Sequence, residues 1–230
     1  VQCATGFAMH DPEYLRLVRA LCDQYQVHLI ADEIAVGCGR SGTFFACENA
    51  QIWPDFVCLS KGISGGYLPL SLVMTRDDIY QGFYHTDVRR GFLHSHSYTG
   101  NPLACRAALA TLEIFESDDV LVQNRVKAET ITQALQPLAQ HAQVKHFRQQ
   151  GMMWAFDAVF HDTKKDAKDE QAAKTFSRRF FTQALQEELL LRPIGNTVYL
   201  MPPYILNQEE ISLVGERMLK VFNHVMGEAA

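Results

Sequence analysis

The chain has 230 residues, of which 47% are hydrophobic and 20% are charged, a composition typical of a globular protein with a substantial core. Its formal net charge of −5 and the lack of long lysine or arginine runs argue against nucleic-acid or anionic-membrane partners, so we expect small-molecule partners. No apolar segment reaches the roughly 18–20 residues that a membrane span requires, and we expect a soluble, cytoplasmic protein.

The first predicted element is an amphipathic helix. Asp11 supplies an N-cap, Pro12 suits the first helical position, and the apolar residues that follow recur at helical spacing. Three short apolar runs come next, and each predicts a buried strand: residues 27–31, expected to be buried on both faces, then 56–59 and 70–74.

Two reactive side chains follow neighbouring strands of this series. Asp32 comes directly after the first strand, and Lys61 comes two residues after the second. Strands separated by helical segments indicate parallel pairing, and parallel strands bring their carboxyl ends to one edge of the sheet. We therefore expect an α/β fold with a mostly parallel sheet, in which Asp32 and Lys61 share an edge.

The pattern of charged and apolar residues changes after Glu116. A long helix begins near Asn101, and the residues beyond it alternate between charged helices and short apolar strands, which predicts an α+β domain. We expect a boundary that separates a domain of residues 1–115 from a smaller domain of residues 116–230. Trp154 is expected in the core of the second, the polar run 161–171 in a solvated loop and helix start, and Asn207 with Glu210 at the capping box of the last helix.

The six cysteines never form a C-x-x-C pair and fall mostly in apolar segments, which indicates reduced thiols. His94 and His96 have a spacing that suits a metal pair, but no third ligand is evident, so no metal site is predicted.

A lysine beside a buried strand is costly as a charged group, and an uncharged amine is what bond formation with an aldehyde requires. Asp32 precedes Lys61 by 29 residues. A carboxylate and an amine at one sheet edge suit pyridoxal phosphate, because the carboxylate binds the ring nitrogen and the amine binds the aldehyde carbon. Without Asp32, a solvated lysine at a domain edge would explain Lys61 equally well.

The stretch "LIADEIAVGCGRSGTFFACENAQIWPDFVCLSKGISGG", residues 29–66, resembles the cofactor segment of class III aminotransferases of fold type I. The resemblance implies pyridoxal phosphate as cofactor, with Asp32 at the pyridine nitrogen, Ile34 against the ring and Lys61 bonded to the aldehyde carbon. It also implies that the predicted domains are part of the large cofactor domain and the C-terminal small domain.

Two further stretches, "HSHSYTGNPLAC" at 94–105 and "RPIGNTVYLMPPY" at 192–204, look most similar to family members of the biotin pathway. Many relatives have a glutamine three residues after the aspartate, whereas this chain has Ala35, as the biotin-pathway members do. This resemblance implies transfer of an amino group to 8-amino-7-oxononanoate, giving 7,8-diaminononanoate, with S-adenosylmethionine as the donor.

Residues 94–101 match a family loop that reaches across a homodimer to the partner's cofactor phosphate. By this resemblance Ser97 supplies the phosphate-binding hydroxyl, with His96 beside it. Relatives often have "HGPTF" here, so Ser95, His96 and Ser97 are departures, and Ser95 lies where a change affects the substrate pocket.

Arg192 matches the arginine that receives the carboxylate of the oxononanoate, a role that suits a planar, bidentate donor. Tyr199 matches a nearby pocket tyrosine. Taken alone, an arginine before Pro193 would more often be a surface residue at the end of a strand.

Two alternatives remain open. The same scaffold also serves class III enzymes that act on other ω-amino acids, diamines or semialdehydes. The resemblance also implies a phosphate loop and a ring-stacking aromatic residue in a half that precedes Val1, so we expect this chain to be part of a longer enzyme, or else a catalytically silent module.

Overall fold

A computed structural model of the chain describes residues 1–160 and 167–227, with side chains described up to 160 and from 174 onward. The residues fold into two compact units, which we call the first unit (His10–Leu121) and the second unit (Val1–Met9 with Val122–Ala230). The sequence did not indicate that the first nine residues pack with the second unit. Assignment of the units to the large and small domains of an enzyme stays a prediction. The predicted solvated run 161–171 lies outside the described side chains.

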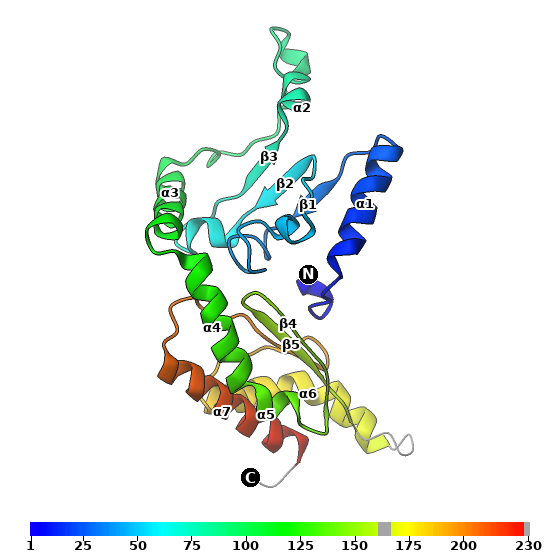
Figure 1. Ribbon diagram of the computed structural model, residues 1–230, viewed down its shortest axis with the longest axis vertical. Coiled ribbons are helices and arrows are strands. Elements are labelled where there is room, and N and C mark those ends of the chain that lie inside the picture. The colour runs from blue at the N-terminus through cyan, green and yellow to red at the C-terminus, as the bar shows by residue number, and fades with distance from the viewer. Residues whose placement is uncertain (161–166, 228–230) are drawn as a thin grey trace. The chain divides into compact units, whose positions relative to one another are not determined.

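The first unit contains a three-stranded sheet in the order β1-β2-β3, with α1 and α3 as its longer helices (Figure 1). Asp11 caps α1 as predicted, because its carboxylate accepts a hydrogen bond of 2.8 Å from the Glu13 N–H. The elements are α1 (Pro12–Gln24), β1 (Ile30–Asp32), η2 (Ala46–Ala50), β2 (Phe56–Leu59), η3 (Lys61–Ser64), β3 (Leu72–Thr75), α2 (Asp77–Gln81), η4 (Val88–Arg90) and α3 (Pro102–Ser117), where η marks a 3-10 helix.

The pairing of the strands confirms one part of the sequence prediction and corrects another. β1 and β2 are parallel, with Asp32 opposite Cys58. β2 and β3 are antiparallel, so the expected parallel pairing is wrong for the third strand. The reason is the connection: between β2 and β3 the chain forms only the short η3, and a parallel return normally requires a longer crossover.

The first strand is also shorter and more exposed than predicted. β1 begins at Ile30, whose side chain is 62% exposed, so the strand is not buried on both faces. It lies at the edge of its sheet, and in the described part of the chain this face of Ile30 remains open to solvent. The core of the unit is small and lies around Val57 and Leu59 of β2, with Ile63 of η3 and Ala108 of α3.

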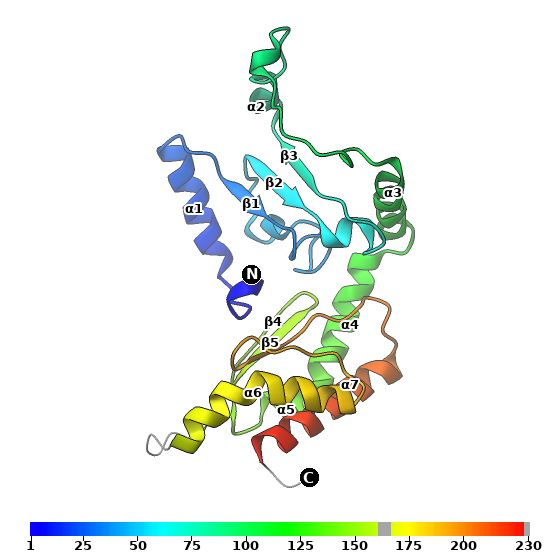
Figure 2. The ribbon, with the colours of Figure 1, turned by 180° about the vertical axis from the view of Figure 1, so that it is seen from behind.

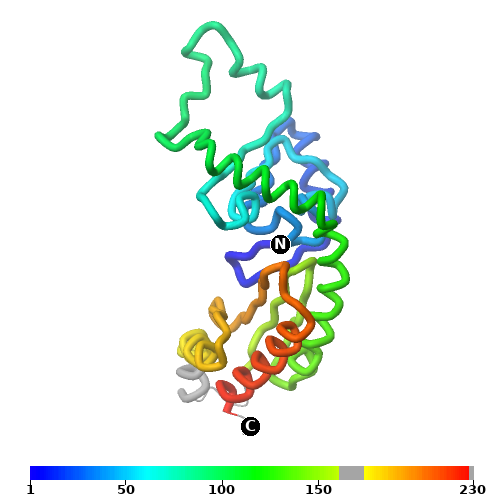
Figure 3. Tube along the Cα trace, turned by 90° about the vertical axis from the view of Figure 1, so that its left-hand side faces the viewer, coloured from blue at the N-terminus to red at the C-terminus, as the bar shows by residue number. Residues whose placement is uncertain are grey.

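The segment between β3 and α3, residues 76–101, projects away from the sheet (Figures 1 and 3). It contains α2 and η4 and has several exposed apolar side chains, among them Phe92, Leu93 and Tyr98. The residues 94–101 that resemble a cofactor-binding loop belong to this segment.

The second unit contains an antiparallel sheet in the order β4-β5-β6 and three long helices (Figure 2). Asn207 and Glu210 form the predicted capping box of α7, with hydrogen bonds of 2.8 and 2.9 Å between side chain and backbone. The elements are η1 (Cys3–Thr5), α4 (Val120–Ala134), α5 (Gln136–Ala139), β4 (Val144–Gln150), β5 (Met153–Ala158), α6 (Ala167–Gln186), β6 (Thr197–Leu200) and α7 (Gln208–Met226).

One face of this second sheet forms the larger core of the protein. Trp154 and Phe156 alternate along β5 and lie opposite Leu200 and Val198 of β6, so the four side chains share a face. Trp154 is 1% exposed, as predicted for a core residue, and its indole N–H donates to the Thr132 hydroxyl at 2.9 Å. Aromatic and aliphatic side chains of α4, α6 and α7 complete the cluster.

In the part of the chain that the structure describes, no helix combines the length and apolar character needed to cross a bilayer.

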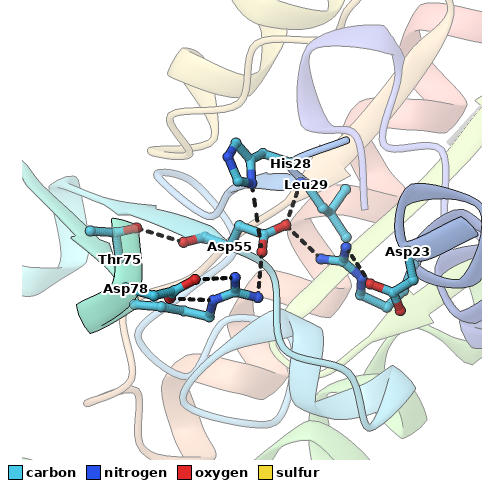
Figure 4. Close-up of polar contacts among 8 residues, drawn as sticks. Asp23, His28, Leu29, Asp55, Thr75 and Asp78 are labelled. Carbon is cyan, nitrogen blue, oxygen red and sulfur yellow. Dashed lines mark hydrogen bonds and ion pairs between the residues drawn. The ribbon is translucent and has the colours of Figure 1, made fainter. Parts of the chain in front are cut away.

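Asp55, at the start of β2, joins the polar ends of several elements of the first unit (Figure 4). Its carboxylate is 4% exposed and accepts hydrogen bonds from the Leu29 N–H at 2.7 Å and the Arg19 guanidinium at 2.8 Å. Arg76, at the end of β3, forms a second ion pair of 2.8 Å with it, and the Thr75 hydroxyl donates to the Asp55 carbonyl. The network ties α1, the approach to β1, and β3 to one buried group.

Burial by itself would raise the pKa of Asp55, but the Leu29 N–H and the Arg19 guanidinium outweigh this effect. The pKa therefore lies below its ordinary value of 3.8. A pKa that is lower in the folded state than in the unfolded state stabilises the fold above the unfolded value, and this stabilisation is lost as the pH falls toward the folded value.

We expect Asp55→Asn to lower the free energy of unfolding by about 2–3 kcal/mol at neutral pH, because it removes the buried carboxylate that pairs with Arg19 and leaves that largely buried arginine with only the exposed Asp23 as an ion-pair partner. Urea denaturation measures the change. Asp78→Asn is the matched control, since Asp78 pairs with the same Arg76 but is exposed, and its removal is expected to have little effect. The gap between Asp55→Asn and the natural protein should narrow as the pH falls below about 4; equal stability at neutral pH would contradict the role of Asp55.

Candidate active site

Asp32 lies at the carboxyl end of β1, where its carboxylate is exposed. One oxygen accepts a hydrogen bond of 3.1 Å from the N–H of Ile34, the half-buried residue that begins the turn after the strand. The charge of Asp32 acts on its strand neighbour: burial raises the pKa of the Cys58 thiol, and the nearby carboxylate raises it further. Asp32 therefore presents a negative charge at the sheet edge, and the residues that the structure describes leave most of its acceptor capacity unused.

Lys61 lies just beyond the end of β2, at the start of η3, and is exposed. Its backbone has a φ of +47°, in the left-handed region that non-glycine residues seldom occupy, so the chain turns sharply at this residue. The turn is held by Ser60, whose hydroxyl donates to the Leu70 carbonyl at 2.7 Å. Among the described residues, the Lys61 amine forms no hydrogen bond or ion pair, which leaves it available to a ligand.

The spacing of these two groups fits the cofactor that the sequence implies. Paired parallel strands lie about 5 Å apart, which sets the distance from Asp32 to Cys58, and Lys61 follows Cys58 by three residues, a reach of at most about 11 Å. A carboxylate for the ring nitrogen and an amine for the aldehyde carbon are the two groups that pyridoxal phosphate needs, and both are exposed here. The residues present at this edge therefore fit it.

Gly62 and Cys38, which the sequence gave no reason to connect, pack the turn against the loop that follows Asp32. A Cβ atom on Gly62 would lie 2.9 Å from the Cβ of Cys38, too close for a side chain. Cys38 itself is buried and has a φ of +52°. In the same loop a Cβ on Gly37 would lie 2.7 Å from Leu59, the last residue of β2. The segment after Asp32 therefore lies directly against the residues on either side of Lys61.

Ser95, His96 and Ser97 lie in the projecting segment 76–101, and all three are exposed. The His96 ring accepts a hydrogen bond of 3.1 Å from the Tyr98 N–H, and the Thr99 hydroxyl accepts one of 3.0 Å from the His96 N–H. These bonds form a compact turn that leaves the Ser97 side chain open to solvent.

Arg192 and Tyr199 lie in the second unit, on either side of a tight turn. Ile194 and Thr197 form an antiparallel bridge across this turn, and Arg192 and Tyr199 each lie two residues beyond it. Arg192 is exposed, whereas Tyr199 is half-buried and its ring stacks on Phe7 with a centroid distance of 4.4 Å. The backbone at Phe7 is fixed by Arg148, whose guanidinium donates a hydrogen bond of 3.0 Å to the Phe7 carbonyl.

The structure thus brings Asp32, Ile34 and Lys61 to one sheet edge. The residues Ser95–Ser97 lie in the projecting segment of the same unit, and the other two predicted substrate residues, Arg192 and Tyr199, lie in the second unit. Among the residues whose side chains the structure describes, no group of three or more histidine, cysteine or acidic side chains is arranged to hold a metal ion. None of the six cysteines, all of which the structure describes, forms a disulfide, and two of them, Cys38 and Cys47, are buried.

A surface groove of about 480 Å³ lies in the second unit between α4 and the start of α7, with Val126, Leu206 and Ile211 in its wall. Lys127 also lines it and donates a hydrogen bond to the Tyr204 carbonyl. None of the predicted site residues belongs to this groove.

Comparisons of this chain with protein families and with known proteins all point to one family. A model of the family described as "Aminotransferase class-III" matches residues 1–222. A Helicobacter pylori protein named adenosylmethionine-8-amino-7-oxononanoate aminotransferase is 44% identical over 230 residues, which cover 98% of this chain and 50% of the relative. A protein of the same name from Geobacter sulfurreducens is 36% identical over 228 residues, 99% of this chain and 50% of its own length.

Solved structures that resemble this chain are aminotransferases as well. A crystal structure of adenosylmethionine-8-amino-7-oxononanoate aminotransferase from Methanocaldococcus jannaschii matches with a TM-score of 0.86 and 32% identity, over 96% of this chain and 51% of that one. The PLP-bound form of an amine transaminase from an uncultivated Pseudomonas species matches with a TM-score of 0.83 and 31% identity, over 96% and 50% of the two chains. The chain spans about half the length of the curated relatives it matches.

The close approach of Gly62 to Cys38 is testable by substitution. We expect Gly62→Ala to lower the free energy of unfolding by about 1–3 kcal/mol, because the added methyl group overlaps the Cys38 side chain. Cys38→Gly removes that side chain and suits the left-handed backbone at position 38, so most of the cost of Gly62→Ala should vanish when it is measured in a Cys38→Gly background. Urea denaturation of the four proteins measures this coupling, and equal costs in both backgrounds would show that the two residues do not touch.

Proposed function

The chain belongs to the class-III aminotransferase family, and from this premise we propose that it supplies the lysine and the aspartate of a pyridoxal phosphate-dependent transamination. The observation that supports the proposal is the parallel pairing of β1 with β2, which brings Asp32 and Lys61 to one sheet edge. When bound, pyridoxal phosphate supplies an electron sink for the carbon that gains or loses the amino group.

Asp32 has the task of keeping the ring nitrogen protonated. A carboxylate about 4 Å from a pyridinium gains roughly 4 kcal/mol at an effective dielectric constant of 20. That energy corresponds to a rise of about three units in the pKa of the ring nitrogen. A protonated ring accepts electron density more readily, so the acidity of the substrate carbon depends on this contact.

Lys61 has two tasks in succession. Its amine would hold the cofactor in the site through the aldehyde carbon. When it is not engaged in this way, the Lys61 Nζ would take a proton from the substrate carbon and return it. The lack of an ion pair at this amine among the described residues suits both tasks.

We propose 8-amino-7-oxononanoate as the acceptor, 7,8-diaminononanoate as the product and S-adenosylmethionine as the donor. The names of the relatives support this choice, as do the stretches at 94–105 and 192–204. Arg192 is exposed, so it can bind the carboxylate of the acceptor through two parallel hydrogen bonds. Tyr199 would form one side of the substrate pocket, because its ring is fixed by stacking on Phe7. Ser95 would border the substrate.

We further propose a homodimer in which His96 and Ser97 bind the phosphate of the cofactor of the partner. The segment that carries them projects from its own sheet (Figure 3), and both side chains are exposed, so they are accessible to a second subunit. Six cysteines without a disulfide suit the reducing cytoplasm as the place of the reaction.

A second candidate is amino transfer to another ω-amino acid, diamine or semialdehyde. The likeness to an amine transaminase of 31% identity supports it, because Asp32 and Lys61 would act in the same way and only the substrate pocket would differ.

Lys61 is tested by the visible absorption band that a lysine forms with pyridoxal phosphate. The purified protein should show the band when the cofactor is added, and Lys61→Ala should abolish it. Lys145→Ala is the matched control, since Lys145 is an exposed lysine of the second unit and should leave the band unchanged. Persistence of the band in Lys61→Ala would refute the assignment, and its absence from the natural protein would favour a catalytically silent module.

Arg192 is tested by steady-state kinetics of the cofactor-loaded enzyme. Arg192→Ala should raise the KM for 8-amino-7-oxononanoate about 10–100-fold, the scale expected when hydrogen bonds to a charged group are lost. The KM for S-adenosylmethionine should change little, and Arg192→Lys should fall between the two, because an ammonium group cannot form the bidentate pair. An unchanged KM for the oxononanoate would favour the second candidate.

A further inference from the structure

Glu33 follows Asp32 directly in sequence but lies in the opposite environment. Asp32 is exposed at the sheet edge, whereas Glu33 is 3% exposed. Adjacent side chains of extended chain point to opposite sides, which explains how neighbours can differ so strongly. A buried carboxylate is costly unless hydrogen bonds satisfy it, so the partners of Glu33 show what the residue holds in place.

The partners of the Glu33 carboxylate are backbone groups rather than a cation. One oxygen accepts a hydrogen bond of 2.6 Å from the Ala46 N–H, and the other accepts one of 2.8 Å from the Cys47 N–H. These are the first two N–H groups of η2, which have no partner within their own helix. The bonds are charge-assisted and close the loop of residues 33–47 onto its own first residue.

The backbone of Glu33 is fixed as well. Its N–H donates to the Cys58 carbonyl at 3.0 Å, which extends the ladder between β1 and β2 by one bond beyond Asp32. Its carbonyl accepts from the Gly37 N–H at 2.8 Å, which turns the chain directly after Asp32. The peptide group on each side of Glu33, the one that joins it to Asp32 and the one that joins it to Ile34, is therefore fixed by a hydrogen bond.

The loop that Glu33 closes also contacts the lysine turn. Cys38, within this loop, lies against Gly62, and Gly37 lies against Leu59. A shift of the loop would therefore move the chain that leaves Asp32 and the surface on which the Lys61 turn packs.

We infer that Glu33 is a positioning residue, whose buried carboxylate holds the loop of residues 33–47 so that Asp32 and Lys61 keep the spacing that the cofactor ring requires. The inference rests on the proposed function. Glu33 would not touch the cofactor; it would act through the backbone of the residues that do.

Glu33→Gln tests this role, because an amide offers one acceptor oxygen and turns a donor toward the second N–H. Two quantities are measured on the folded protein: the dissociation constant of pyridoxal phosphate, and the pH midpoint at which the visible band of the lysine-bound cofactor changes. The dissociation constant should rise about fourfold, the factor expected when a carboxylate moves from about 4 to about 5 Å from a pyridinium at an effective dielectric constant of 20.

The pH midpoint separates a positioning role from a general loss of stability. If Asp32 moves from about 4 to about 5 Å from the ring nitrogen, its hold on the ring proton weakens by about half a pKa unit. A less firmly protonated ring withdraws less charge from the lysine-bound nitrogen, so that nitrogen keeps its proton to higher pH. The midpoint should therefore rise, by at most about half a pH unit, a shift that a change in stability alone would not produce.

Ala46→Pro provides a second variant that does not touch Glu33. Proline removes the N–H that donates to one Glu33 oxygen, it is accepted at the first position of a helix, and the preceding Phe45 already has the extended conformation that proline requires (φ −102°, ψ 136°). It should shift both quantities in the same direction by a smaller amount. Glu48→Gln, in the same 3-10 helix, is the control and should change neither.

The outcomes distinguish this inference from the function on which it rests. If the natural protein shows no visible band with pyridoxal phosphate, the proposed function fails and the inference fails with it. If the band is present and Glu33→Gln and Ala46→Pro leave both the affinity and the pH midpoint unchanged, the inference alone is overturned. If Glu33→Gln does not fold, the two measurements on Ala46→Pro decide.

Discussion

The parallel pairing of β1 with β2 is the constraint on which the candidate site depends. It places Asp32 opposite Cys58 and so fixes how far the chain must run to reach Lys61. A slip of one residue in this register would send Asp32 to the other face of the sheet. The pairing is defined at both ends by bonds outside the strands themselves: the Asp55 carboxylate accepts from the Leu29 N–H before β1, and the Glu33 N–H donates to the Cys58 carbonyl after it.

Three acidic residues near these strand ends have different tasks because their surroundings differ. Asp55 and Glu33 are buried, and arginine or backbone N–H groups occupy their oxygens, so they stabilise the fold and have little capacity to bind a ligand. Asp32 is exposed and accepts one hydrogen bond from the described part of the chain, so its charge is available. A buried carboxylate with all its partners in place and an exposed one with few partners thus lie side by side in the chain.

The sequence predicts those features of the fold that depend on neighbouring residues. The Asp11 cap and the bounds of β2 at Phe56–Leu59 follow from local patterns, and so does the placement of Asp32 and Lys61 at strand ends. Features that depend on distant residues could not be predicted. The antiparallel return of β3, the packing of the first nine residues with the second unit, and the bonds from Glu33 to η2 all join segments whose pairing no local pattern specifies.

The difference between the two cores explains why polar bonds matter so much near the candidate site. In the second unit, large side chains of a sheet and three helices form one extensive apolar cluster, and such burial holds the fold without directional bonds. The first unit has a much smaller cluster around Val57 and Leu59, while Ile30 and Val73 on its strands stay exposed. Apolar packing fixes strand spacing there only weakly, so the positions of Asp32 and Lys61 depend more heavily on hydrogen bonds that have a defined direction. A site that must hold two groups a few ångströms apart gains from this arrangement, because directional bonds specify geometry more closely than apolar contact does.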